Sequence, residues 1–168
     1  LGIFHLAQRA RAGPARETPL QRRDLPWLGL VVLAGGIAGP LLLMVGLAQT
    51  PASTAALLLN VEGLATMAIA WVVFRENVDR RLLLGALAIL AGAALLSWQG
   101  GPSGFDLGAL AIIGACLAWG IDNNLTRKLS SSDPVQIAMV KGLVAGAVNL
   151  ALAFGRGASL PPMDEIAA

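Results

Sequence analysis

The stretch from Pro51 to Phe74 limits what this chain can fold into more than any other part of it. It is almost wholly apolar and contains no proline after its first residue. As a helix rising about 1.5 Å per residue it would be about 36 Å long, which is enough to cross a bilayer. Four further stretches have a similar character, at residues 26–48, 81–98, 106–124 and 134–154.

Composition favours the same class of protein. Apolar residues make up 56% of the chain and charged residues 13%, whereas soluble domains carry about 25% charged residues. The sequence therefore predicts an all-α polytopic membrane protein with five complete spans. Residues 1–7 resemble the end of one further helix and residues 163–168 the start of another, so we expect a fragment of a longer chain.

The basic residues predict how the spans are oriented. Ten of the twelve Lys and Arg residues lie in the loops 8–25, 75–81 and 126–133, whereas the loops on the other side hold only Arg156. Short loops rich in Lys and Arg stay in the cytoplasm. We therefore expect these three loops to be cytoplasmic, in a multi-pass protein of the plasma (inner) membrane. Because the basic residues lie between apolar spans, they indicate no nucleic-acid partner.

Signatures of enzymes, metals and cofactors are lacking in the sequence. One Cys and one His exclude both a disulfide framework and a metal site made of several His or Cys ligands. Residues 101–104 match the G-x-S-G of rhomboid-type intramembrane proteases, but here the serine lies in a loop and the histidine is His5. We therefore expect no enzymatic activity, no metal and no cofactor.

Glu62 is an ionisable residue near the middle of the apolar stretch 51–74, about 13 Å from its outer end. Thr66 follows one helical turn later on the same face, whereas Asn60 points elsewhere. A carboxylate at this depth is costly unless it is paired, protonated or facing water. Two interpretations remain open: a substrate contact or proton carrier in a wet cavity, or a protonated side chain held by hydrogen bonds between helices.

Lys141 lies about 10 Å inside the last complete span, with Asn149 two turns later on the same face. Asp122 has a similar depth on the preceding span. The sequence predicts an Asp122–Lys141 ion pair, or a three-way set with Glu62, that acts as a gate. The alternatives are a lysine that reaches the headgroups and an aspartate in interfacial water.

Asp122 begins the polar run 122–124, and Trp119 precedes it by one turn on the same face. Trp119 is a candidate to line a cavity, the alternative being a place in the aromatic belt at the membrane interface. The candidates for a substrate pathway are therefore Asn60, Glu62, Thr66, Trp119, Asp122, Asn123, Lys141 and Asn149.

Residues 46–96 resemble the drug/metabolite transporter superfamily, in its EamA-like branch. The family's pattern has an alanine- and leucine-rich stretch, a polar patch in a central helix, an acidic residue at the inner helix end and a pair of spaced glycines. Residues 114–134 are similar to the start of the family's second repeat. The matching positions are residues 48–58, Asn60, Glu62, Glu76, Gly85 and Gly92. The family usually places proline directly after the central polar position, where this chain has Gly63.

The resemblance implies a ten-helix transporter made of two inverted five-helix repeats. The chain would hold helices three to seven, with residues 1–98 as the C-terminal part of the first repeat and 99–168 as the N-terminal part of the second. In such folds the substrate lies near the bilayer midplane, which is the depth of Glu62 and Asn149.

The resemblance also implies a function, namely secondary active transport of a small organic metabolite or drug by alternating access, in the direction of efflux. The expected partners are the lipid bilayer, a small-molecule substrate and protons as the coupling ion, and a homodimer remains an open alternative. The competing function is that of a non-transporting membrane scaffold or assembly subunit. In that case the glycine pairs 35/39, 85/92 and 142/146 would serve helix packing.

Overall fold

The described part of the protein is a bundle of helices. The computed structural model describes residues 20–97, 107–129 and 132–158. The predicted helix ends at residues 1–7 and 163–168 and the predicted span limits at residues 98 and 106 lie outside these ranges. The helical elements are η1 (Arg22–Asp24), α2 (Leu25–Val31), η2 (Val32–Ala38), α3 (Gly39–Leu47), α4 (Ala52–Leu58), α5 (Val61–Val72), α6 (Arg80–Ser97), α7 (Leu107–Lys128) and α8 (Pro134–Gly155).

Among the described residues, four helices are long and apolar enough to cross a membrane: Arg22–Leu47, Ala52–Val72, Leu107–Lys128 and Pro134–Gly155. The remaining predicted span, residues 81–98, corresponds to α6. These helices confirm the class predicted from the sequence, an all-α polytopic membrane protein.

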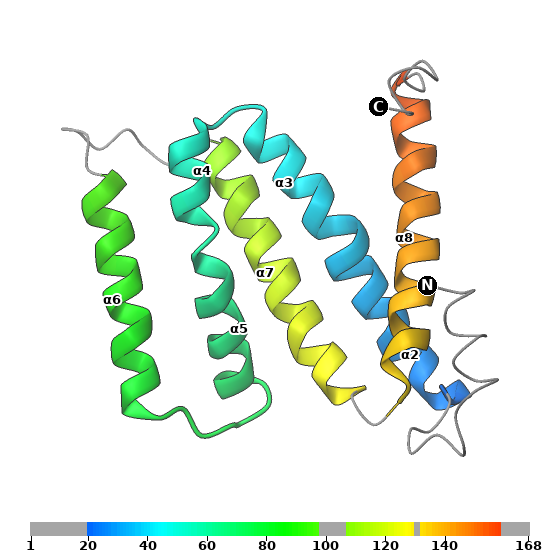
Figure 1. Cartoon of the computed structure of the whole chain (residues 1–168), viewed down its shortest axis with the longest axis horizontal. Helices are drawn as coiled ribbons and strands as arrows, with labels where there is room; N and C mark the ends of the chain where they lie inside the picture. Colours follow the sequence, from blue (N-terminus) through cyan, green and yellow to red (C-terminus); the bar gives the residue numbers. More distant parts are fainter. Residues whose placement is uncertain (1–19, 98–106, 130–131, 159–168) are drawn as a thin grey trace.

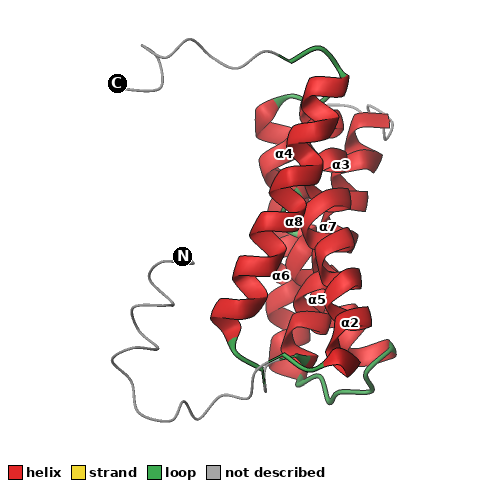
Figure 2. Cartoon of the chain, turned by 90° about the vertical axis from the view of Figure 1, so that its right-hand side faces the viewer, coloured by secondary structure: helices red, strands yellow, loops and turns green. Residues whose placement is uncertain are grey.

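The helices run alternately up and down, and α7 lies between its neighbours α3 and α5 (Figures 1 and 2). The α6 helix forms one edge of the row and packs mainly on α4. The α8 helix forms the other edge and packs on α2 and η2 of the first span. Two buried clusters hold α7 in place, one with Leu28 and Ile137 and the other with Ala55.

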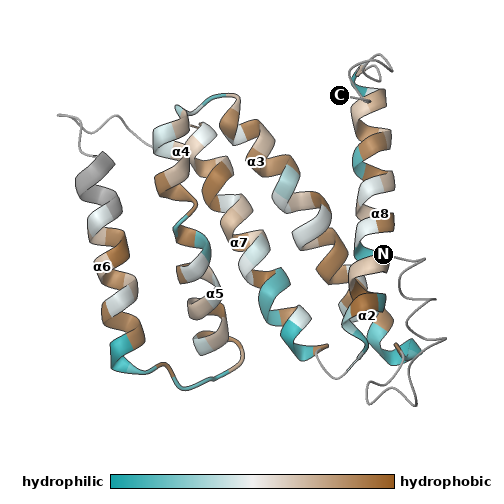
Figure 3. Ribbon diagram, viewed as in Figure 1, coloured by the Kyte–Doolittle hydropathy of each residue, from teal (hydrophilic) through white to brown (hydrophobic). Residues whose placement is uncertain are grey.

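The basic residues gather at one end of the bundle, which we call the basic end. It comprises the starts of the first span, α6 and α8 and the ends of α5 and α7 (Figure 1). Figure 3 shows hydrophilic colouring at this end and again within α5, α7 and α8, between apolar turns. The basic side chains at this end are Arg22, Arg23, Arg75, Arg80, Arg81, Arg127 and Lys128.

The first span contains a wide turn. Residues 32–38 form a π-helix, in which the Gly39 N–H bonds to the Ala34 carbonyl, five residues back. The next residue is Pro40, which has no N–H to donate to the preceding turn. A π-segment followed by proline therefore leaves backbone carbonyls open for partners on other helices. The first span thus has a widened turn directly before its proline.

The second span is less regular than the sequence predicted. Its helix is interrupted at residues 59–60, between α4 and α5. The Asn60 side-chain amide donates to the carbonyls of Ala56 (3.2 Å) and Leu57 (3.1 Å), so it competes with the backbone for its own helix's carbonyls. The span then ends near Arg75, which has a left-handed backbone (φ 54°).

Glycines set how closely the helices approach. A Cβ on Gly35 would overlap the Asp122 carboxyl group, and one on Gly46 would overlap the Ile112 side chain. The predicted contact at the 35/39 pair is thus confirmed. The pairs 85/92 and 142/146 meet no atom within 4 Å in the described structure.

Replacing Gly46 with leucine should lower the free energy of unfolding by about 1–3 kcal/mol, because the new side chain has no room beside Ile112 and the Gly108 carbonyl. Gly29 lies on the same span with nothing within 4 Å, so Gly29→Leu should change stability by less than about 0.5 kcal/mol. Thermal unfolding of the purified protein in detergent measures both, and equal losses would contradict the close α3–α7 contact.

Candidate functional site

A cavity of about 550 Å³ lies between α5, α6 and the end of α7. Binding sites for small molecules commonly have volumes of about 300–1,000 Å³. The cavity extends from Glu76 and Asn77 in the α5–α6 loop to Asn60. Asn60 and the end of α5 are about 18 Å apart along the helix. The cavity therefore connects the basic end to the middle of the second span.

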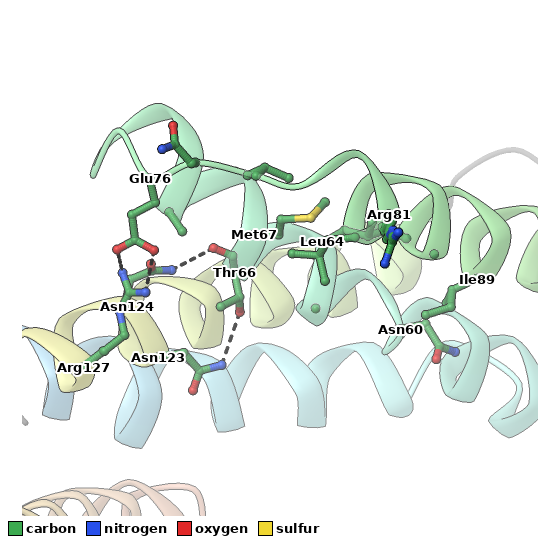
Figure 4. Close-up of a pocket in the computed structure, with 17 residues that line it drawn as sticks. Asn60, Leu64, Thr66, Met67, Glu76, Arg81, Ile89, Asn123, Asn124 and Arg127 are labelled. Atoms are coloured by element: carbon green, nitrogen blue, oxygen red, sulfur yellow. Dashed lines mark hydrogen bonds and ion pairs between the residues drawn. The ribbon is translucent and has the colours of Figure 1, made fainter.

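Glu62 and Thr66 are joined by one side chain of α7. The Asn123 amide donates to Glu62 Oε1 (3.2 Å) and to Thr66 Oγ1 (3.3 Å). This geometry confirms that Glu62 and Thr66 share a face of the helix, and it puts Asn123 with them. Thr66, Asn123 and Asn60 line the cavity (Figure 4). Glu62 is half-buried and is not among the residues that line the cavity, but its neighbour Gly63 lines it.

Asn124 contributes to the same contact, although it was not among the candidates. It is only 3% exposed, and its amide donates to the carbonyls of Thr66 (2.9 Å) and Gly120 (2.8 Å). A Cβ on Gly120 would lie about 3.0–3.1 Å from the Ala65 and Thr66 backbone. The sequence signal was the spacing of Gly120 and Asn124, four residues apart, which puts a small residue and an amide on one face.

The predicted ion pair between Asp122 and Lys141 is present. Asp122 is 5% exposed and lies against Gly35, and it also accepts a hydrogen bond from Thr126 Oγ1 (3.2 Å). The pair forms on the side of α7 that faces η2 and α8, whereas Glu62 bonds to Asn123 on the α5 side. Of the two arrangements left open by the sequence, the structure contains the pair.

The carbonyls exposed by the π-turn of the first span receive donors from two other helices. Trp119 Nε1 donates to the Gly35 carbonyl (3.2 Å), and Asn149 Nδ2 donates to the Gly36 carbonyl (2.8 Å). Trp119 covers Gly39. Trp119, Asn149 and Lys141 thus belong to the contact between the first span, α7 and α8. They are not among the residues that line the cavity.

The basic end holds two contacts that sequence reasoning missed. Arg127 of α7 pairs with Glu76 of the α5–α6 loop, and the Lys128 ammonium lies 3.9 Å from the centre of the Trp27 ring. Glu76 was noted only as a position that resembles a family pattern, and nothing in the sequence pointed to its partner. These contacts tie the end of α7 to both neighbouring spans.

The model of the EamA-like transporter family matches residues 6–98. An uncharacterized transporter of Methanothermobacter thermautotrophicus is 33% identical over 140 residues, which are 80% of this chain and 41% of the relative. A probable terminal-alkyne amino-acid exporter of Streptantibioticus cattleyicolor is 27% identical over 129 residues, 77% of this chain and 43% of the relative.

A third relative is shorter. A probable 4-amino-4-deoxy-L-arabinose-phosphoundecaprenol flippase subunit of Pseudomonas paraeruginosa is 41% identical over 78 residues, which are 46% of this chain and 65% of the relative. No solved structure matches the chain.

The apolar helices and the polar contacts between them define a multi-pass α-helical membrane protein. Because the family model covers more than half of the chain, the chain belongs to the EamA-like transporter family. It spans about four tenths of the length of the first two relatives.

Lys141→Ala should destabilise the protein by about 3 kcal/mol, because it leaves the Asp122 carboxylate buried without its counter-ion. The double change Asp122→Ala with Lys141→Ala should recover much of this loss. Arg156→Ala, at an exposed arginine at the other end of α8, is the control. Thermal unfolding in detergent measures all of them, and additive losses would show that the two side chains do not act as a pair.

Proposed function

We propose that the chain is part of a secondary active transporter that moves a small organic metabolite or drug by alternating access, in the direction of efflux. The observation that carries this proposal is the cavity between α5, α6 and α7, lined within the spans by Asn60, Thr66 and Asn123. Polar side chains at membrane depth are costly, and they are typical of a substrate pathway. The names of the transporter and exporter relatives support the same function.

The position of the cavity supports an inward-facing state. The positive-inside rule puts the basic end in the cytoplasm of a plasma (inner) membrane, and the cavity reaches that end at Glu76 and Arg81. The α6 helix packs mainly on α4, away from the basic end. A swing of α6 about that contact would close the cavity on the cytoplasmic side.

We further propose that residues 1–98 are the C-terminal part of a first repeat and residues 99–168 the N-terminal part of a second. The family match over residues 6–98 and the share of the relatives that the chain covers support this division. In an inverted-repeat transporter the remaining helices would complete the pathway around α5 and α7.

Glu62 is the group that we propose for proton coupling. Apart from Asp24, which lies in the first turn of the first span at the basic end, the acidic side chains within the described spans are Glu62 and Asp122, and Asp122 is already paired with Lys141. Glu62 has a neutral amide as its hydrogen-bond partner. Glu62 is therefore the carboxyl group that can take up and release a proton without breaking an ion pair.

Glu62→Gln should abolish flux driven by a pH gradient, because glutamine keeps an oxygen for the Asn123 amide but cannot exchange a proton. Flux of an organic substrate in proteoliposomes measures this, with Asp79→Asn, at an exposed loop carboxylate, as the control. Unchanged flux would refute the coupling role of Glu62.

An assembly subunit that does not transport is the second candidate, since one relative is named as a flippase subunit. The two functions differ in the carbodiimide labelling of Glu62. A transporter's substrate should protect this carboxyl group from labelling, whereas a scaffold should be labelled at the same rate with and without substrate.

Gly63→Leu should reduce flux about ten-fold or more without lowering stability, because Gly63 lines the cavity and has nothing within 4 Å. Gly142→Leu is the matched control, since Gly142 is equally uncrowded but lies on α8, outside the cavity lining. Flux and thermal unfolding are measured for both variants. Equal flux in the two would show that the cavity is not on the pathway.

A further inference from the structure

The charged side chains of the cavity are not balanced. Glu76, Arg81 and Arg127 line it, and Glu76 is paired with Arg127. The guanidinium group of Arg81 has no hydrogen-bond or ion-pair partner in the described ranges, although its backbone N–H bonds to Asp79 Oδ1 (3.2 Å). The cavity wall therefore carries one positive charge that is free to bind an anion.

The wall next to this charge is apolar. Arg81, Gly85 and Ile89 line the cavity at intervals of four residues, so they form one stripe of α6 about 12 Å long. Leu64 and Met67 of α5 also line it. A ligand whose charged group binds Arg81 would therefore lie with its body against hydrocarbon.

A hydrogen-bond acceptor occupies another part of the cavity. Asn60 lies well apart from the pair of Glu76 and Arg127 (Figure 4). Because the Asn60 Nδ2 donates to the carbonyls of Ala56 and Leu57, its Oδ1 is the part left to bind a ligand. An amide oxygen accepts hydrogen bonds, so it suits an ammonium or hydroxyl group.

We propose that this cavity binds a small organic acid, with its carboxylate or phosphate on Arg81, its apolar body along α5 and α6, and a hydrogen-bond donor on Asn60. A guanidinium group matches the planar geometry of such acid groups with two parallel hydrogen bonds. The inference rests on the proposed transport function in one respect, namely that the bound acid is the transported substrate.

Binding to the purified protein in phosphatidylcholine nanodiscs tests the inference, with calorimetry as the measurement. The probes are ε-aminocaproate, which has both an acid and a donor, caproate, which has only the acid, and hexylamine, which has no acid. We expect ε-aminocaproate to bind most tightly and caproate more weakly. Hexylamine should bind with no dependence on Arg81.

Arg81→Gln should weaken the binding of both acids about ten-fold or more, since a charge-assisted bidentate contact is lost. Arg81→Lys should have a smaller effect, because it keeps the charge. Arg80→Gln is the matched control: Arg80 is the neighbouring arginine on α6, is also exposed and does not line the cavity. Equal binding in Arg81→Gln and Arg80→Gln would overturn the proposal, as would a preference for hexylamine.

The acid group could come from a soluble molecule or from an anionic lipid headgroup, and the same assay separates these sources. If phosphatidylglycerol added to the nanodiscs displaces ε-aminocaproate, and does so only when Arg81 is present, the bound acid is a lipid headgroup. If it does not, the acid is soluble.

The proposed binding site and the proposed transport function can be refuted independently of each other. Acid binding that depends on Arg81 but occurs without flux would refute the transport function and leave the site intact. If flux is observed but the Arg81→Gln change does not alter acid binding, the proposed site is refuted and the transport function stands.

Discussion

The scarcity of water inside a bilayer is the constraint on which this structure depends. Each backbone polar group within a span must find its partner in the protein. The π-turn before Pro40 leaves the carbonyls of Gly35 and Gly36 to accept hydrogen bonds from α7 and α8. A local irregularity in one helix thus becomes the point where three helices are joined.

The α7 helix divides the bundle into two polar regions. Consecutive residues on a helix point about 100° apart, so Asp122 and Asn123 face different neighbours. Asp122 pairs with Lys141 over Gly35, whereas Asn123 bonds to Glu62 and Thr66. The first region is enclosed between packed helices, and the second adjoins the cavity. One short polar run therefore contributes both to the packing of the bundle and to the proposed pathway.

Several parts of the candidate site could be predicted from the sequence because they follow from depth and helical spacing. The matched depths of Asp122 and Lys141 predicted their ion pair, and the spacing of four residues put Glu62 and Thr66 on one face. The place of Trp119 could not be predicted in this way. Its position over Gly39 depends on how α7 is rotated against the first span. The sequence of one helix does not determine its rotation relative to another helix.

The sequence by itself determined the class of protein, the approximate spans and the clustering of the basic residues, because these properties depend on hydropathy and charge along the chain. The tertiary structure alone decided that Asn123 would bind Glu62 and that Arg127 would pair with Glu76. It also decided that Arg81 would line a cavity without a partner among the residues that the structure describes. In a bilayer, lipid and protein offer nearly the same apolar surroundings. Hydrophobicity therefore brings a helix into the membrane but does not choose its neighbours. That choice depends on close contact at glycines and on hydrogen bonds between side chains distant in the sequence.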